Sequence, residues 1–229
     1  LFSALCHTAL SLWGEEGVQT LVRQAKAGEL LLSDSMPWRE LAHEDVYYLP
    51  KPCAVSEKKQ EVPANLRKKM KRLSWIPVSD MGRFEQSICG NALYEPGNDA
   101  FGVVSERTSA QIEENADATP YQVGSFRFYP DCGLYVLVGV QTEAQAEQMS
   151  RLLSALGMSG IGGKISSGYG SFTVEDQIDL SQPFDGQTKW LHDALEEREA
   201  KHWLLLTTSL SADDELEAAL EGAQYQLVR

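Results

Sequence analysis

The sequence GMSGIGGKISSGYG, residues 157–170, joins a helical pattern to a strand pattern and contains six glycines and one lysine. Residues 143–156 before it have the apolar spacing of an amphipathic helix, and residues 171–174 after it alternate like a strand. Glycine allows positive φ and lets a backbone approach a ligand without a Cβ in the way. Successive N–H groups in such a loop can bind an anion, and lysine and serine add charge and hydroxyl donors. The stretch therefore predicts binding to the phosphates of a nucleotide or of a nucleic acid.

Two nucleotide-binding fingerprints fail on this loop. A P-loop needs a glycine five residues before its Gly-Lys pair and Ser or Thr after the lysine, where this chain has Met158 and Ile165. A dinucleotide fingerprint would need a further glycine at Ile165, and it enters a helix, whereas this loop leaves one. Ordinary turn glycines remain the alternative, although six exceed what one helix cap and one turn need. We therefore expect the loop to bind a polyphosphate backbone.

Charge is distributed unevenly along the chain. The 229 residues carry a net charge of −13, which argues against indiscriminate nucleic-acid binding. Residues 51–72 reverse this sign, because they contain eight basic residues and two glutamates. Such a patch can bind a polyanion or can be a solvated helix face, and both interpretations stay open. The basic residues are Lys51, Lys58, Lys59, Arg67, Lys68, Lys69, Lys71 and Arg72.

Several functional classes find no support in the sequence. No run of about 18 apolar residues is present, so we expect no membrane partner. The four cysteines form no C-x-x-C and the four histidines form no H-x-x-x-H pair, so we expect neither a metal site nor a cofactor. Lone cysteines without a secretory signal fit a cytoplasmic protein. His7, next to Cys6, is expected to be a partly buried structural residue rather than a catalytic base.

The apolar periodicity predicts an α+β chain. Residues 33–38 are expected to form a turn-rich loop, and residues 107–121 a hairpin or a flexible arm. The expected helices are 1–13 and 18–27, separated by Gly14 and Gly17, then 65–73, 80–89, 143–156 and 212–221. The expected strands are 29–32, 46–49, 75–78, 101–106, 123–129, 134–140, 171–177, 203–208 and 223–228.

This order gives a helix, an insertion, a strand pair, a helix and a strand. A further strand upstream of Leu1 would complete βαββαβ, the ferredoxin-like (RRM-like) unit. After a polar linker at residues 179–185 the pattern begins again. Because the chain has no initiator methionine and ends on an unfinished strand pattern, we expect a fragment of a longer protein. The predicted domains are 1–178, with an insertion at about 33–105 and the glycine loop at 157–170, and 179–229, the start of a second, incomplete unit.

Three stretches, in the same order, resemble a known family. They are LFSALC at residues 1–6, LSDSMPW at 32–38 followed by YLPKP at 48–52, and GIGGKISSGYG at 160–170. They are similar to segments of the RAMP superfamily of CRISPR proteins, and in particular of subunit four of the type III-A (Csm) effector complex. The loop is shared across RAMP proteins, whereas its combination with the YLPKP segment is more specific.

The resemblance implies a non-enzymatic RNA-binding subunit with two ferredoxin-like halves, acting in antiviral defence. Its implied partners are the 5′ tag of the guide RNA (crRNA), the large polymerase-like subunit and a backbone RAMP subunit, with target RNA reached indirectly. Loop N–H groups, Lys164 and two serines would hold phosphates, and Tyr169 would either stack on a base or lie in the core. The expected RNA-binding residues are Gly160, Gly162, Gly163, Lys164, Ser166, Ser167, Gly168, Tyr169, Gly170, Lys51, Lys68, Lys69 and Arg72.

Three other functions stay open. Some RAMP relatives cut repeat RNA, and such an endoribonuclease would use a general base such as His7. The chain could equally be the equivalent subunit of a type III-B (Cmr) complex. The loop could also bind the edge of another protein and no RNA.

Overall fold

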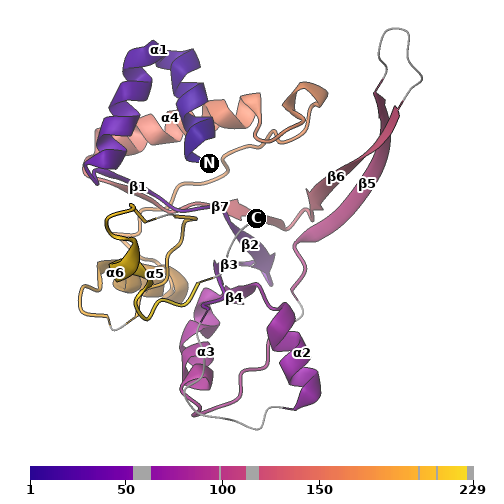
Figure 1. Ribbon diagram of the computed structural model, residues 1–229, viewed down its shortest axis with the longest axis vertical. Helices are drawn as coiled ribbons and strands as arrows, with labels where there is room; N and C mark the ends of the chain where they lie inside the picture. The colour runs from indigo at the N-terminus through magenta and orange to yellow at the C-terminus, as the bar shows by residue number, and fades with distance from the viewer. Residues whose placement is uncertain (54–62, 98, 112–118, 201, 210, 226–229) are drawn as a thin grey trace. The chain divides into compact units, whose positions relative to one another are not determined.

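The computed structural model describes residues 1–53, 63–97, 99–111, 119–200, 202–209 and 211–225 (Figure 1). Its mixture of helices and strands confirms the predicted α+β class. The chain divides into two compact units by its internal contacts. Unit 1 consists of Leu1–Ser35 and Val136–Leu210, and unit 2 of Met36–Tyr135 and Ser211–Arg229. The expected division into residues 1–178 and 179–229 stays a prediction.

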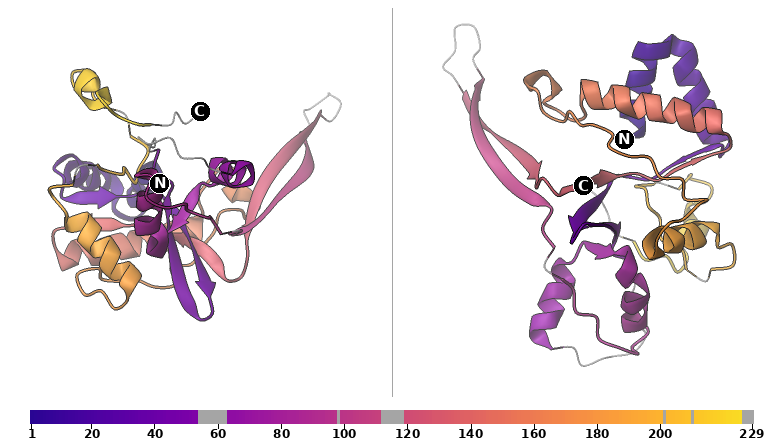
Figure 2. Two further views of the ribbon diagram at one scale, coloured as in Figure 1. Left: turned by 90° about the horizontal axis from the view of Figure 1, so that it is seen from below. Right: turned by 180° about the vertical axis from the view of Figure 1, so that it is seen from behind.

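Unit 1 packs two helices against a short antiparallel ladder (Figures 1 and 2). The ladder pairs Leu30 with Val140 and Leu32 with Val138. The elements of unit 1 are α1 (Phe2–Lys26), β1 (Leu30–Leu32), β8 (Val138–Val140), α4 (Glu143–Ser159), the 3-10 turn η2 (Ile165–Ser167) and α5 (Gly186–Glu196).

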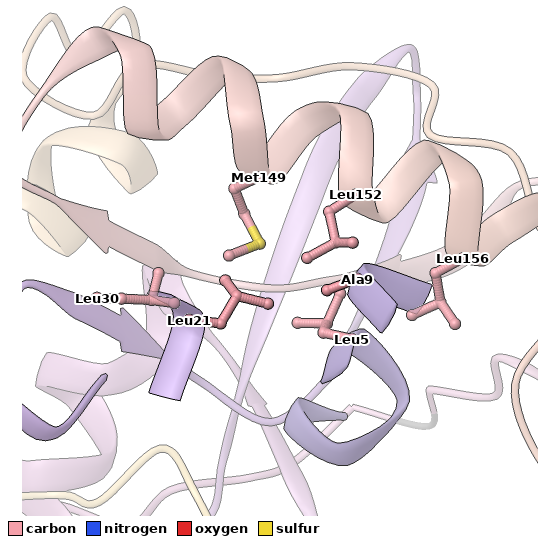
Figure 3. Packing of buried hydrophobic residues seen from close by; sticks show 7 residues of the cluster. All are labelled: Leu5, Ala9, Leu21, Leu30, Met149, Leu152 and Leu156. Carbon is pink, nitrogen blue, oxygen red and sulfur yellow. The ribbon is translucent and has the colours of Figure 1, made fainter. Parts of the chain in front are cut away.

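The core of unit 1 lies between α1, α4 and β1 (Figure 3). Its apolar residues are three or four positions apart along α4, and Leu5 and Ala9 are four positions apart on α1, which gives each helix a buried stripe. Each buried leucine contributes about 1.5–3 kcal/mol to stability. This packing fixes the end of α4, from which the glycine loop leaves. The cluster consists of Leu5, Ala9, Leu21, Leu30, Met149, Leu152 and Leu156.

The two principal helices of unit 1 follow the predicted pattern with one difference each. α1 runs through both expected helices and is interrupted at Gly14, whose φ of 69° and ψ of −163° are not helical. Gly17, by contrast, continues the helix, so the expected break there is wrong. α4 begins at a capping box of Thr142 and Gln145 and extends beyond the predicted end, to Ser159.

Unit 2 contains a four-stranded antiparallel sheet in the order β4-β3-β2-β7 and a separate hairpin, β5-β6. The hairpin ladder runs from Gly102 paired with Phe128 to Gln111 paired with Thr119, which confirms the hairpin alternative for this region. The elements of unit 2 are β2 (Met36–Leu41), β3 (Glu44–Pro50), α2 (Ala64–Arg72), β4 (Trp75–Pro77), the 3-10 turn η1 (Val78–Asp80), α3 (Met81–Ile88), β5 (Gly102–Gln111), β6 (Thr119–Phe128), β7 (Cys132–Tyr135) and α6 (Leu216–Leu220).

The YLPKP segment anchors the basic helix of unit 2. Tyr48 and Leu49 are buried in β3, and the N–H of Lys51 donates to the carbonyl of Ser74 at 2.8 Å, which carries the chain alongside β4. On α2, which confirms the helix expected at 65–73, Leu66 is buried and Met70 half-buried. These two side chains fix one face of α2 inward, and the charged side chains therefore lie outward.

Two predicted elements in the middle of the chain are wrong. The expected strand 134–140 is two strands, β7 and β8, because Cys132–Tyr135 pair with β2, Val138–Val140 pair with β1, and residues 136–137 belong to neither ladder. The Oγ of Ser33 accepts from the N–H of Leu137 at 2.8 Å at the break. The expected loop 33–38 contains the start of β2. Pro37 is accommodated because the β2–β3 ladder, which would need its N–H, begins only at Trp38.

The C-terminal expectations are mostly wrong. Residues 171–177 and 203–208 form no strand in the described structure, because alternation gives an extended chain but a strand also needs a paired ladder. The chain near Leu206 makes single contacts instead, such as the N–H of Asp34 to the Leu206 carbonyl at 2.8 Å. The expected helix 212–221 shortens to α6, and of the expected strand 223–228 the described residues 223–225 are irregular. Helix α5 was not predicted at all.

Candidate nucleic-acid interface

The glycine loop is closed at its base by two backbone hydrogen bonds. The N–H of Phe172 donates to the Gly157 carbonyl at 3.0 Å, and the N–H of Ile161 donates to the Gly170 carbonyl at 2.9 Å. Gly170 has a φ of +78°, and a Cβ there would lie 1.9 Å from the carbonyl oxygen of Ile161. The loop can therefore close only with glycine at residue 170, because a side chain there would collide with the Ile161 carbonyl.

The tip of the loop is different. A Cβ at Gly162 or Gly163 would meet no atom within 4 Å, and only Gly162, with a φ of +113°, has a backbone that favours glycine. Nothing in the described residues explains why residue 163 is glycine. Both residues are exposed, and neither backbone N–H donates a hydrogen bond within the part of the chain that the structure describes. The tip thus presents two adjacent, exposed residues whose N–H groups have no acceptor among the described residues, as a phosphate site would need.

The side chains predicted to bind RNA surround this tip. The hydroxyl groups of Ser166 and Ser167 are exposed on the short η2 turn, which ends at Gly168 with a φ of 81°. Tyr169 is 41% exposed, so it is not the core aromatic that was the alternative. Lys164 is half-buried and has an interaction partner within the chain.

The dipole of α4 does not assist anion binding here. The loop leaves the C-terminus of α4, which carries partial negative charge, whereas helix sites for phosphate lie at N-termini. Gly160 ends the helix with a φ of 83°, and the effect of the dipole fades within the last turn. Attraction for an anion must therefore come from the loop N–H groups and Lys164.

Exposed apolar side chains flank the loop, and sequence reasoning missed them. Met158 is 88% exposed and Ile165 47%, and Ile161 and Phe172 are also exposed. They could have been noticed in the sequence as large apolar residues inside a glycine-rich loop, where no periodic pattern buries them. Next to Tyr169, they give the loop a surface on which a base can pack.

The second predicted set lies in unit 2, on α2 and directly after β3. Lys51 and Lys69 are engaged within the chain: the Nζ of Lys51 donates to the Met70 carbonyl at 3.0 Å, and that of Lys69 pairs with Glu95 at 3.2 Å. Lys68 and Arg72 are exposed and form no ion pair or hydrogen bond with another described residue. Lys58 and Lys59 lie outside the described residues.

The residues considered for catalysis and metal binding are found in three places. His7 is exposed on α1, which corrects the expectation that it is partly buried. Burial raises the pKa of the Cys6 thiol, and it likewise raises the pKa of Cys132, which disfavours the reactive thiolate. Searched over the described residues, the chain has no group of three His, Cys, Asp or Glu placed to hold a metal ion. Over the same residues, no helix is long and apolar enough to cross a membrane.

Comparison with known proteins identifies the family. The CRISPR protein Csm4 of Mycobacterium tuberculosis is 32% identical over 233 residues, which cover all of this chain and 68% of that protein. The chain belongs to the Csm4 family of CRISPR proteins. Csm4 of Streptococcus thermophilus is 29% identical over 239 residues, again covering all of this chain. No family model matches the chain.

A solved structure has a similar fold. A chain of a Csm1–Csm4 cassette, crystallised in complex with cA4, matches 68% of this chain with a TM-score of 0.53 and 21% identity. The match spans 57% of that solved chain. The relatives of the Csm4 family are therefore longer than the present chain.

Proposed function

We propose that this chain is the guide-RNA-binding part of a Csm4 subunit in a type III-A effector complex. It holds the 5′ tag of the crRNA through the glycine loop and performs no catalysis itself. Membership of the Csm4 family supports the assignment to this complex. The observation that carries the RNA-binding role is Gly163: it is exposed, no described residue gives a steric or conformational reason for glycine there, and its N–H, like that of Gly162, has no acceptor among the described residues.

The proposed partners follow from the family. A solved relative is bound to Csm1 in a Csm1–Csm4 cassette, which supports contact between this chain and the large polymerase-like subunit. The family resemblance implies contact with a backbone RAMP subunit on the other side, so that the chain bridges the two in the cytoplasm during antiviral defence. Target RNA would reach this chain only through the guide.

We further propose that unit 1 is the centre of a ferredoxin-like unit. Its order α1-β1-β8-α4, with an antiparallel strand pair and two packed helices, is the αββα part of βαββαβ. The flanking strands of such a unit would extend the two-stranded ladder. The incomplete second unit implied by the resemblance remains part of this proposal.

Two assays test the proposed function. In filter binding, the protein should retain a guide RNA with its 5′ tag more strongly than the same guide without it. Equal retention of both RNAs, or of neither, would contradict the role in holding the tag. A precursor crRNA incubated with the protein should stay intact, and specific cleavage would favour the endoribonuclease alternative.

A further inference from the structure

Helix α2 carries a stripe of cations that form no ion pair with any residue the structure describes. Lys68, Lys71 and Arg72 are three and four residues apart, so they lie on one face of the helix. All three are exposed, and none of their side chains forms a hydrogen bond or an ion pair with another described residue. We call these three residues the α2 stripe. Because the chain as a whole has a net charge of −13, this local positive cluster indicates a binding surface for an anionic partner.

The neighbouring basic residues have other roles, which separates them from the stripe. The ammonium group of Lys51 donates to the Met70 carbonyl, one of the last carbonyls of α2, and so stabilises the helix end. Lys69 points toward Glu95 at 3.2 Å. The stripe is therefore smaller than the run of basic residues in the sequence, and it is set on a helix whose other side is anchored by Leu66.

The composition of this surface distinguishes a nucleic acid from a protein partner. Stable protein interfaces have an apolar or aromatic centre and are depleted in lysine. Helix α2, all of which the structure describes, exposes no large hydrophobic side chain. Phosphate backbones, in contrast, are bound by lysine and arginine without an apolar anchor. The exposed surface of α2 therefore matches a nucleic acid and not a protein partner.

We propose that the α2 stripe binds the phosphate backbone of single-stranded RNA, independently of base sequence, as a second contact in addition to the glycine loop. This inference rests on the proposed RNA-binding function. Each phosphate contact on a single strand changes the log–log salt slope of binding by about 0.7, so three contacts account for about 2. No aromatic side chain is exposed on α2 to read or stack a base, which is why we infer sequence independence.

The test compares two triple variants in the assembled complex. In the first, Lys68, Lys71 and Arg72 are replaced by Gln, which removes the stripe but is nearly as good a helix former. In the control, the exposed Arg23, Lys26 and Arg198 of unit 1 are replaced by Gln, which gives the same net charge. The probes are tagged guide RNA, target RNA added to guide-loaded complex, and oligo(U), each measured over a salt series.

The stripe variant should flatten the salt slope by about 2 for at least one of these RNAs, and the control should not. A change with the guide assigns the contact to crRNA, and a change only with target assigns it to target RNA. A variant with Lys68→Arg, Lys71→Arg and Arg72→Lys should keep the wild-type slope. Unchanged slopes in all arms would overturn the inference, as would loss of Csm1 co-purification with RNA slopes intact.

The same experiment separates this inference from the proposed function. If the wild-type complex binds no guide RNA, the proposed function itself fails. If Gly163→Asp weakens guide binding but the stripe variant behaves like its control, only the α2 inference fails.

Discussion

The glycine loop of unit 1 and helix α2 of unit 2 present groups for an anion by opposite means. In the loop, backbone N–H groups are held in place by hydrogen bonds at the base, and Lys164 is half-buried. On α2, long side chains extend into solvent with no partner among the described residues. Fixed backbone donors select a geometry, whereas mobile charges attract any polyanion. The comparison predicts that the loop positions RNA and that α2 adds salt-sensitive attraction.

A smaller contrast lies within the loop. Gly170 is required by closure, since its Cβ would collide with the Ile161 carbonyl, while Gly163 faces open space. Substitutions at these two residues should therefore separate the folding of the loop from its binding of RNA.

The largest expected effect comes from a negative charge at the tip. Gly163→Asp blocks close approach and repels phosphate, so the affinity for tagged guide RNA should fall by about 10- to 100-fold, the size of a lost charged hydrogen bond. The control is Gly82→Asp on α3, which adds the same charge at a position where a Cβ also meets nothing within 4 Å. Equal affinity of the two variants for tagged guide RNA in filter binding would contradict the claim that the loop tip contacts the RNA.

The next prediction separates the glycine that closes the base of the loop from the glycine at its tip. Gly170→Ala forces a residue with a Cβ into a φ of +78° and should lower the free energy of unfolding by about 1–2 kcal/mol or more. Gly163→Ala should change the free energy of unfolding by less than about 1 kcal/mol, yet weaken guide binding. Urea denaturation and filter binding measure the two quantities. A Gly170→Ala protein as stable as Gly163→Ala would show that the base of the loop is not closed as described.

A pH effect sharpens the contrast between the units. Burial, above all, raises the pKa of Tyr48, Tyr94 and Tyr135 in unit 2, and nearby Asp99 and Asp80 raise those of the first two further. The unfolded chain therefore loses these phenolic protons first, and the stability of unit 2 should fall as pH rises above about 10. Circular dichroism and tyrosinate absorbance across this range test it. Tyr94→Phe should reduce the alkaline loss, and ionisation of all tyrosines near pH 10 in the folded protein would contradict it.

The smallest expected effect is at the candidate base. His7 is exposed on α1, and among the described residues no group of three His, Cys, Asp or Glu is placed to hold a metal ion. His7→Ala should leave RNA binding and target-RNA cleavage by the assembled complex unchanged. Loss of cleavage in a fully assembled variant complex would revive the endoribonuclease alternative.

The parts of the fold that the sequence predicts well are those that local patterns determine. Helices α2 and α4 and strands β1 and β3 have clear periodicity, and they were expected close to their observed places. The split of residues 134–140 depends on which strands lie beside them, and apolar alternation carries no such information. Helix α5 was missed although Asp185 and Thr188 form a reciprocal cap, because that pair differs from the usual Ser/Thr and Glu/Gln signature.

The candidate site is partly predictable from the sequence, again because some of its features are local patterns. Glycine content and Lys164 mark the loop in the sequence, but only coordinates separate Gly170, fixed by closure, from Gly163, which has no internal reason to be glycine. Likewise, the basic run is visible in the sequence, whereas the partners of Lys51 and Lys69 depend on Met70 and Glu95 being brought nearby by folding.

The most direct test of the central claim is crosslinking of the assembled complex with 4-thiouridine placed in the 5′ tag of the crRNA. Digestion with trypsin followed by mass spectrometry would locate the attached peptides. We expect the tag to crosslink to residues 152–164 and 165–189, which contain the loop tip and Tyr169. A complex that retains its crRNA but gives tag crosslinks only elsewhere would contradict the claim that the glycine loop holds the guide.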